Sequence, residues 1–281
     1  MTARELLDSG RRRLADLPET DPALEARVLL LRTTGFTELE ILAYPDRPVA
    51  AVAARRFLRR IEARRGRVPL AYIVGEKEFW SIPMTVSPAV LIPRPETELL
   101  VEKTLSLAVS SEPTIVEIGT GSGCIAVALA KELPGARLLA TDISRRSLRV
   151  AILNAVRHGA TNVEFVRGDL YGSLQGRELE GRVDFIVSNP PYVAAAEWSR
   201  LTPEVRDHEP RRALVPGPTG LETIRRLIRG GRRFLRPGGI LLLEFGDGQV
   251  DEVLGLLDAR WAHPEIFPDL SGRPRVLAVS A

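Results

Sequence analysis

The sequence contains very few cysteines and histidines, the residues that form disulfides and that ligate zinc and similar metals. Cys124 is the one cysteine among 281 residues, so a disulfide within the chain is impossible and a thiolate metal cluster is excluded. The histidines lie far apart and show no metal-ligand spacing; they are His158, His208 and His263. We therefore expect a protein that works without a bound metal.

Long apolar runs are also missing. No stretch approaches the roughly 18 consecutive apolar residues that a membrane-spanning helix needs. The first residues, "MTARELLDSGRRRLADL", lack the apolar core of a secretory signal. We expect a soluble, cytoplasmic protein with no membrane partner.

Charges of the two signs are nearly balanced. The chain has 39 Lys and Arg against 36 Asp and Glu, which gives a net charge of +3. So small an excess does not by itself indicate a nucleic-acid partner. With 44% hydrophobic residues the chain can bury a sizeable core, and its length suggests one large domain with a smaller one.

Three regions of the chain differ in pattern. Residues 1–66 carry apolar residues at helical spacing and lack strand patterns, which predicts a small helical bundle. Residues 67–96 hold two β-rich runs separated by Gly75 and the "GEKE" turn, and several prolines follow; this predicts a β-hairpin linker. Residues 97–281 alternate between strand and helix patterns, with one of the helices expected over 221–239. Such alternation is typical of an α/β domain with a mostly parallel, doubly wound sheet.

The segment "EIGTGSGCIA" connects a predicted strand to a predicted helix. Its loop consists of Gly119, Thr120, Gly121, Ser122 and Gly123. Three alternating glycines permit a tight turn and let a ligand approach the backbone closely, which is more than a turn alone requires. The loop leaves the cofactor open between a dinucleotide and S-adenosylmethionine, because Cys124 stands where the dinucleotide fingerprint prefers another small residue.

Acidic residues lie in or after the predicted strands near the expected ligand crevice. Asp142 suits the ribose hydroxyls of either cofactor, or else caps the next helix. Asp169 suits an adenine amino group while Leu170 packs on the ring, or else is a simple turn residue. Glu117, inside the strand before the loop, either braces the loop or meets a cofactor ammonium group through water.

The stretch "SNPPYV" follows the apolar strand "VDFIV". Because proline lacks an N–H and fixes φ, Pro190 and Pro191 make a rigid segment that presents acceptors without neighbouring donors. The Asn189 side-chain oxygen and the Pro190 carbonyl can hold both hydrogens of a planar –NH₂ group, with Tyr192 as a flat wall. A sulfonium methyl is the electrophile that suits such a nitrogen. The alternative is a turn that merely ends the strand.

Together these segments resemble a known family. The loop "EIGTGSG", the strand end "ATDIS", "GDL" and "SNPPYV" resemble amino methyltransferases of the class I S-adenosylmethionine fold. The segments "VSPAVLIPRPETE" and "PEVRDHEPRRALVPGPTGLETIRRLI" narrow the resemblance to the PrmC/HemK family, the release factor glutamine methyltransferases. The resemblance covers nearly the whole chain, and the pairing of "LIPRPETE" with "NPPY" is its specific part.

The resemblance implies a seven-stranded methyltransferase domain (97–281), a hairpin linker (67–96) and an amino-terminal domain (1–66) that docks the substrate. It implies methyl transfer from S-adenosylmethionine, which leaves as S-adenosylhomocysteine, to the glutamine amide nitrogen in the Gly-Gly-Gln motif of class I peptide release factors. The cofactor positions that it matches are Gly119 to Gly123, Asp142, Leu170 and Asn189, and the substrate site is Asn189, Pro190, Pro191 and Tyr192. Asp169 joins the cofactor set from its place after a strand, and Leu170 departs from the aromatic residue that is frequent in the family.

Several interpretations stay open. Arg94, Glu96 and Glu98 either frame the mouth of the crevice or cap the helix that follows. The arginines within residues 55–65 form either a solvated helix face or a docking surface for an acidic part of the release factor. The alternative function is an amino methyltransferase acting on nucleic acid such as adenine, although a basic, aromatic-rich recognition domain is missing. A third class is a nicotinamide oxidoreductase. We expect a monomer with no direct nucleic-acid substrate.

Overall fold

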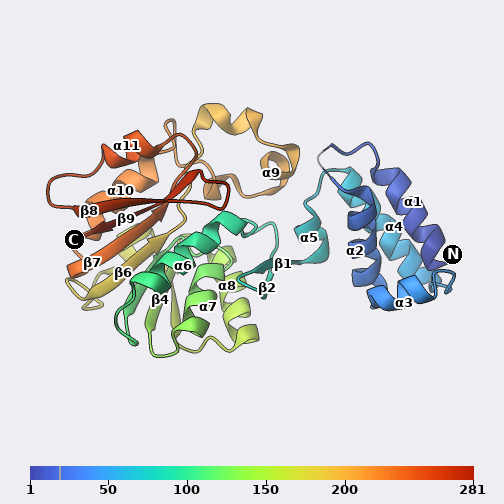
Figure 1. Cartoon of the computed structure of the whole chain (residues 1–281), viewed down its shortest axis with the longest axis horizontal. Coiled ribbons are helices and arrows are strands. Elements are labelled where there is room, and N and C mark those ends of the chain that lie inside the picture. The colour runs from blue at the N-terminus through green and yellow to red at the C-terminus, as the bar shows by residue number, and fades with distance from the viewer. Residues whose placement is uncertain (19) are drawn as a thin grey trace. The chain divides into compact units, whose positions relative to one another are not determined.

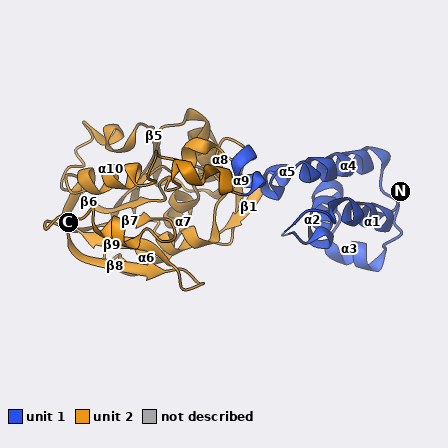
Figure 2. Ribbon diagram, turned by 90° about the horizontal axis from the view of Figure 1, so that it is seen from above, with its two compact units in different colours: residues 1–75, 202–208 blue, residues 76–201, 209–281 orange. Residues whose placement is uncertain are grey.

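The computed structural model describes residues 1–18 and 20–281 (Figure 1) and divides them into two compact units (Figure 2). The first unit comprises residues 1–75 and 202–208, and the second comprises residues 76–201 and 209–281. Within the described residues, no helix is both long and apolar enough to cross a membrane.

The first unit is a bundle of helices, as the sequence predicts. Its helices are α1 (Ala3–Leu14), α2 (Pro22–Thr34), α3 (Glu38–Ala43), α4 (Ala51–Arg65), α5 (Leu70–Val74) and α9 (Pro203–His208). Thr2 and Asp21 begin α1 and α2 by accepting hydrogen bonds from backbone amides that have no partner inside the helix. The apolar faces meet in a core whose fully buried members include Leu6, Leu29, Phe57 and Ile61.

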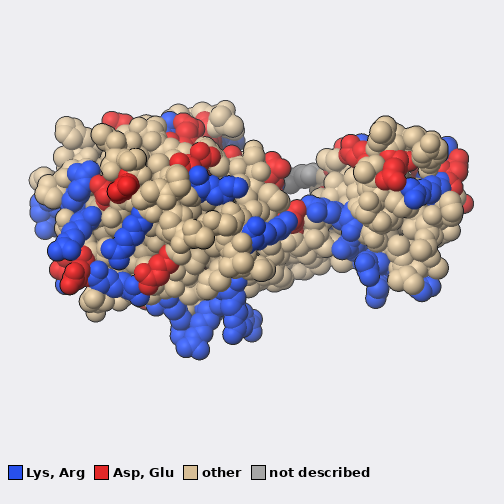
Figure 3. Space-filling model, turned by 90° about the horizontal axis from the view of Figure 1, so that it is seen from below, with Lys and Arg blue, Asp and Glu red and all other residues tan. Residues whose placement is uncertain are grey.

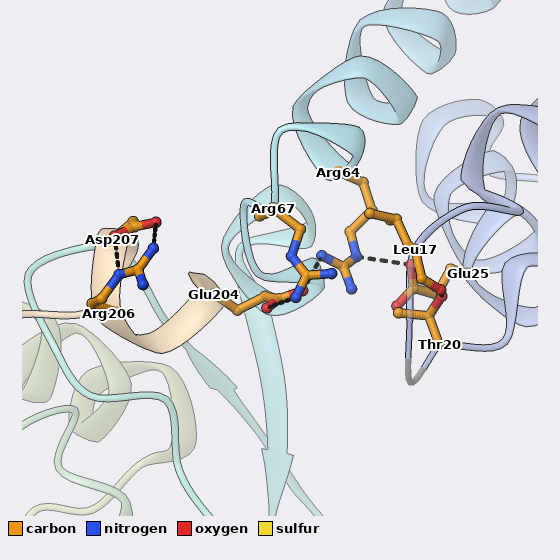
Figure 4. A network of polar contacts seen from close by, with 8 residues as sticks. All are labelled: Leu17, Thr20, Glu25, Arg64, Arg67, Glu204, Arg206 and Asp207. Carbon is orange, nitrogen blue, oxygen red and sulfur yellow. Dashed lines mark hydrogen bonds and ion pairs between the residues drawn. The ribbon is translucent and has the colours of Figure 1, made fainter. Parts of the chain in front are cut away.

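Helix α9 joins this unit through a buried arginine (Figure 4). The side chain of Arg64 is 5% exposed; its Nε lies 2.8 Å from Glu25 Oε2 and its Nη1 lies 3.0 Å from Glu204 Oε1. Arg67 binds the other oxygen of Glu204 at 3.0 Å. The chain therefore leaves the second unit after residue 201, contributes α9 to the first, and returns at residue 209.

The arginines of α4 do not share one environment. Arg64 is buried in ion pairs, Arg60 donates to the Thr33 hydroxyl at 2.8 Å, and Arg65 pairs with Glu62 at the surface. The solvated-face interpretation is therefore wrong for Arg64. On the face drawn in Figure 3, basic and acidic side chains are interspersed, so this face of the described residues is not of one charge sign.

The second unit contains a seven-stranded sheet in the order β5-β4-β3-β6-β7-β9-β8. Its strands are β3 (Thr114–Ile118), β4 (Arg137–Asp142), β5 (Val163–Arg167), β6 (Val183–Ser188), β7 (Leu235–Glu244), β8 (Ala262–Pro268) and β9 (Pro274–Ser280). The strands pair in parallel from β5 to β7, and β9 runs antiparallel to both of its neighbours. Strand order reverses between β3 and β6, which is where ligands bind in doubly wound sheets. The predicted fold class is confirmed.

Helices cover both faces of the sheet (Figure 1). One face packs against α6 (Glu98–Leu107), α7 (Cys124–Glu132) and α8 (Arg145–His158), and the other against α10 (Glu222–Gly231) and α11 (Val250–Leu254). Successive strand residues serve opposite faces: Ile115 belongs to the first core and Val116 to the second. Short 3₁₀ helices complete the unit at Pro95–Thr97, Leu170–Leu174, Ala195–Arg200 and Arg211–Ala213.

Two local predictions are wrong. A hairpin is present, but it consists of β1 (Glu76–Phe79) and β2 (Ile82–Thr85), and its turn lies at Trp80 and Ser81. Of the "GEKE" residues, Gly75 ends helix α5 and the other three belong to β1. The helix expected over 221–239 ends at Gly231, and β7 begins at Leu235. A side chain at Gly230, in the last turn of the helix, would press on the ring of Tyr171.

Candidate active site

A cavity of about 500 Å³ opens in the second unit at the carboxyl ends of β3, β4 and β6. Four segments line it: the glycine loop, the ends of neighbouring strands, the stretch from Ala89 to Thr97, and side chains between Pro210 and Arg226. This is the reversal point of the sheet, so the topology alone makes it the expected ligand site.

The glycine loop presents bare backbone to this cavity. Gly119, Gly121 and Gly123 have φ values of 81°, 56° and 80°, which side-chain-bearing residues rarely adopt. A Cβ atom built on Gly119 or Gly121 would meet nothing within 4 Å, whereas one on Gly123 would lie 3.0 Å from Ala151. The first two glycines thus keep space open for a ligand, and the third lets helix α8 approach the loop.

Asp142 holds the loop in place from the end of β4. Its Oδ2 accepts a hydrogen bond from the Gly121 amide at 3.0 Å, and its Oδ1 accepts one from the Ser144 amide at 2.7 Å. Burial raises the pKa of Asp142, while these two amides lower it. The N-cap of α8 is Ser144, whose hydroxyl accepts from Ser147. Asp142 therefore lines the cavity without being the cap of that helix.

Glu117 braces the other side of the loop. It is 2% exposed, and its Oε2 accepts a hydrogen bond from the Thr120 hydroxyl at 2.6 Å. Burial, aided by the nearby charge of Asp142, raises its pKa to about 7 against the lowering effect of Thr120 and the Ala126 amide. A carboxyl group that titrates near neutral pH thus lines the cavity.

Asp169 and Leu170 lie at the far end of the cavity, after β5. Asp169 Oδ2 pairs with Arg226 Nη2 of α10 at 2.6 Å. Leu170 has φ of 45°, a strained conformation for a leucine. A residue held in such a conformation beside a cavity is typical of a functional site.

Asn189, Pro190 and Pro191 form one wall of the cavity, directly after β6. Ser188 anchors the strand end by donating to the Ile118 carbonyl at 2.6 Å. The Asn189 amide nitrogen donates to Thr97 Oγ1 at 2.9 Å, so its oxygen is left for the cavity side. Tyr192 packs against the core behind this wall, and its hydroxyl donates to Glu244 Oε1 at 3.2 Å.

We did not predict a role for Thr97 or Glu244 from the sequence. The Thr97 hydroxyl donates to Glu244 Oε2 at 2.8 Å while it accepts from Asn189. Glu244 ends the apolar strand β7 and is 1% exposed. A glutamate that follows "ILLL" at a strand's carboxyl end was the available signal, since a buried carboxylate is costly unless it has a task.

The "LIPRPETE" stretch places Arg94 at the cavity, whereas the described structure shows no side-chain capping hydrogen bond at the start of α6. Arg94 lines the cavity and pairs with Glu209 at 2.5 Å, and Glu209 also accepts from the Ile92 amide. Glu98 lies in the first turn of α6 and accepts from the Trp80 amide at 2.8 Å. Within residues 1–18 and 20–281, no group of three or more potential metal ligands is arranged around a common point.

Comparisons with known proteins agree with this geometry. Residues 5–75 match the PrmC N-terminal domain family, and residues 95–206 match the methyltransferase small domain family. A release factor glutamine methyltransferase of Nitratidesulfovibrio vulgaris is 42% identical over 98% of this chain and 94% of its own length. Its counterpart in Moorella thermoacetica is 43% identical over 98% and 97%. A methyltransferase structure from Pyrococcus furiosus, 20% identical, matches 78% of this chain and 98% of that one with a TM-score of 0.52.

Proposed function

Since the chain belongs to the family of release factor glutamine methyltransferases, we propose that it methylates the side-chain amide nitrogen of a glutamine in a peptide chain release factor, with S-adenosylmethionine as methyl donor. The proposal extends to the Gly-Gly-Gln motif of class I release factors, to action in the cytoplasm as a monomer, and to docking of the substrate protein by residues 1–66. The residues of the second unit support the first part of this proposal.

The cavity fits such a donor in size and chemistry. The open backbone at Gly119 and Gly121 suits close approach of a ligand, and a side chain there would fill the space. Glu117 suits an ammonium group, and Asp142 suits ribose hydroxyls. When bound, S-adenosylmethionine supplies a methyl group on a positively charged sulfur and leaves as the neutral thioether S-adenosylhomocysteine.

The orientation of Asn189 carries the proposal for the substrate. Its amide nitrogen donates to Thr97 and the residue lines the cavity, so its oxygen is the atom that remains to accept a hydrogen bond there. The Pro190 carbonyl lies next to it and cannot be paired by an N–H from Pro191, which has none. Two acceptors hold the two hydrogens of a glutamine –NH₂ and aim its lone pair at the methyl group. They also stabilise the positive charge that develops on the nitrogen, which then loses a proton.

The test is methyl transfer from labelled S-adenosylmethionine to a purified class I release factor. We expect label in the wild-type factor and none in a factor whose motif glutamine is alanine. Equal label in both, or label in neither, contradicts the proposal. Label in added RNA or DNA but in no protein would favour the nucleic-acid alternative instead.

A further inference from the structure

A chain of hydrogen bonds runs from Asn189 through Thr97, both of which line the cavity, to the buried carboxylate of Glu244. Asn189 Nδ2 donates to Thr97 Oγ1 at 2.9 Å, and Thr97 Oγ1 donates to Glu244 Oε2 at 2.8 Å. A hydroxyl group has one proton. When Thr97 gives that proton to Glu244, it can only accept from Asn189, so the –NH₂ end of the amide must face Thr97.

Glu244 fixes the direction of this chain at its far end. An ionised carboxylate accepts hydrogen bonds and donates none. Its second oxygen accepts from the Tyr192 hydroxyl at 3.2 Å, so both oxygens have donors. The charged groups nearest to it are Arg275 of β9 and Glu96 of the 3₁₀ helix before α6.

We propose that Thr97 and Glu244 are positioning residues, which hold the Asn189 amide with its oxygen toward the substrate nitrogen. The inference rests on the proposed function, because it assigns these residues a task in binding the glutamine –NH₂. Neither residue lies in the "NPPY" stretch, and both act through Asn189.

Protonation of Glu244 removes the constraint. A protonated carboxyl group can donate to Thr97, which then donates onward to Asn189. The Asn189 side-chain amide can then flip end for end, so that its oxygen accepts from Thr97. Its –NH₂ group then faces the cavity. Two amino groups would then face each other, and the substrate nitrogen would keep the Pro190 carbonyl as its one acceptor. Burial raises the pKa of Glu244 to about 7, against the lowering effect of Thr97, Tyr192 and Arg275. Turnover should therefore fall as the pH drops through about 7.

The first test replaces the hydroxyl. Thr97→Val removes the relay with little change in volume, and Thr97→Ser keeps the hydroxyl. The matched control is Thr104→Val in the same helix-forming region, because the Thr104 hydroxyl is also buried but donates to the Leu100 carbonyl. At saturating S-adenosylmethionine we expect kcat to fall about a hundredfold in Thr97→Val, the scale of a misplacement by about 1 Å. Thr97→Ser and Thr104→Val should stay within a fewfold of wild type.

The dissociation constant for S-adenosylmethionine should be unchanged in Thr97→Val. A Thr97→Val enzyme that turns over like wild type, or that loses cofactor binding in step with activity, overturns the inference. Thermal denaturation shows whether each variant folds. If Thr97→Val does not fold, the activity of Thr97→Ser becomes the test, and we expect it to be retained.

The second test is the pH profile of kcat between pH 5.5 and 8.5 at saturating cofactor, which removes the titration of Glu117 from the measurement. Wild type should lose activity on the acid side, and Glu244→Gln should lack that acid limb. Tyr192→Phe removes a donor that lowers the pKa of Glu244, so its acid limb should move to higher pH. An acid limb that persists unchanged in Glu244→Gln contradicts the inference.

A third readout needs no release factor. The side-chain amide signal of Asn189, identified by its loss in Asn189→Ala, should shift with pH near 7 in wild type and stay constant in Glu244→Gln. If this shift is seen while no release factor is labelled, the positioning inference stands and the proposed substrate fails. If label is transferred but the amide signal is indifferent to both pH and Thr97→Val, the substrate stands and the positioning inference fails.

Discussion

Arg64 and Glu204 lie 140 positions apart in the sequence, yet their side chains form an ion pair of 3.0 Å inside the first unit. The same guanidinium binds Glu25 of α2 at 2.8 Å and is only 5% exposed (Figure 4). A buried cation of this kind is stable only while its carboxylates stay with it. Helix α9 is therefore held in the helical unit by charge, although its flanking segments belong to the other unit.

We predict that Glu204→Gln loosens α9 from the first unit. Removing one partner of a buried ion pair costs about 3–5 kcal/mol when the remaining charge is left without compensation; Arg64 keeps Glu25, so we expect a smaller loss here. The expected result is a lower unfolding temperature and faster hydrogen exchange of the amides in α9. Asp46→Asn is the control, since Asp46 pairs with Arg4 at an exposed site and should change little. Unchanged exchange in α9 would show that other contacts hold it.

We predict that Gly121→Ala weakens cofactor binding more than it weakens the fold. The left-handed φ of 56° costs an alanine roughly 1–2 kcal/mol, and its methyl group would enter the open cavity. Gly159→Ala is a matched control, because Gly159 has φ of 67°, also meets nothing within 4 Å, and ends helix α8. Calorimetric titration with S-adenosylmethionine should show reduced affinity for Gly121→Ala alone, while both variants lose similar stability. Equal affinities would mean that the cofactor lies elsewhere.

Periodicity alone predicted the parallel sheet and the helical bundle, because each strand and helix carries its own burial pattern. The hairpin turn was misplaced because Trp80 and Ser81 adopt φ values of 53° and 56°. Turns of that type usually contain Asn or Gly, and neither residue is present here to indicate the turn. The three residues after Gly75 in "GEKE" have the polar character of a turn but pair with β2 as a strand.

The residues of the cavity wall could be predicted from the sequence, but the residues that position them could not. Asn189 and the glycines of the loop could be identified by their residue types and by their positions directly after strands. Thr97 and Glu244 are 147 positions apart, and only the folded sheet brings β7 beside the start of α6. Tyr192 was expected as a wall, but its hydroxyl turns to Glu244, a partner that no local pattern indicates. Its ring as a substrate wall stays a prediction.

We predict that Asn189→Ala strongly slows methyl transfer while it retains the cofactor. The alanine removes the acceptor for the substrate nitrogen, so the rate should fall by about two to three orders of magnitude, as for the loss of one preorganised polar group. Asn162→Ala is the control: the Asn162 side chain donates two part-buried hydrogen bonds, to the Leu133 and Ala136 carbonyls, and it is not among the residues that line the cavity. Single-turnover transfer and cofactor titration measure the two effects separately. Normal turnover in Asn189→Ala would make the "NPPY" segment a structural turn.

We predict that Glu117 weakens the fold as the pH rises. Its folded-state pKa of about 7 lies above the ordinary 4.5, so its contribution to stability is present below about pH 4.5 and is lost as the pH rises through about 7. A shift of this size corresponds to at most roughly 3–4 kcal/mol, at about 1.4 kcal/mol per pKa unit. Glu117→Gln should therefore gain stability relative to wild type on going from pH 5 to pH 8, as measured by urea unfolding.

The same variant separates stability from binding. Ionised Glu117 attracts the ammonium group of S-adenosylmethionine, so wild-type affinity should increase as the pH rises through about 7, and Glu117→Gln should lose that dependence. Glu164→Gln is the control, because Glu164 is half-exposed in an ion pair with Arg177 away from the cavity lining. A stability difference between Glu117→Gln and wild type that is the same at both pH values would show that Glu117 keeps one protonation state throughout. Cofactor affinity would then have to be independent of pH as well.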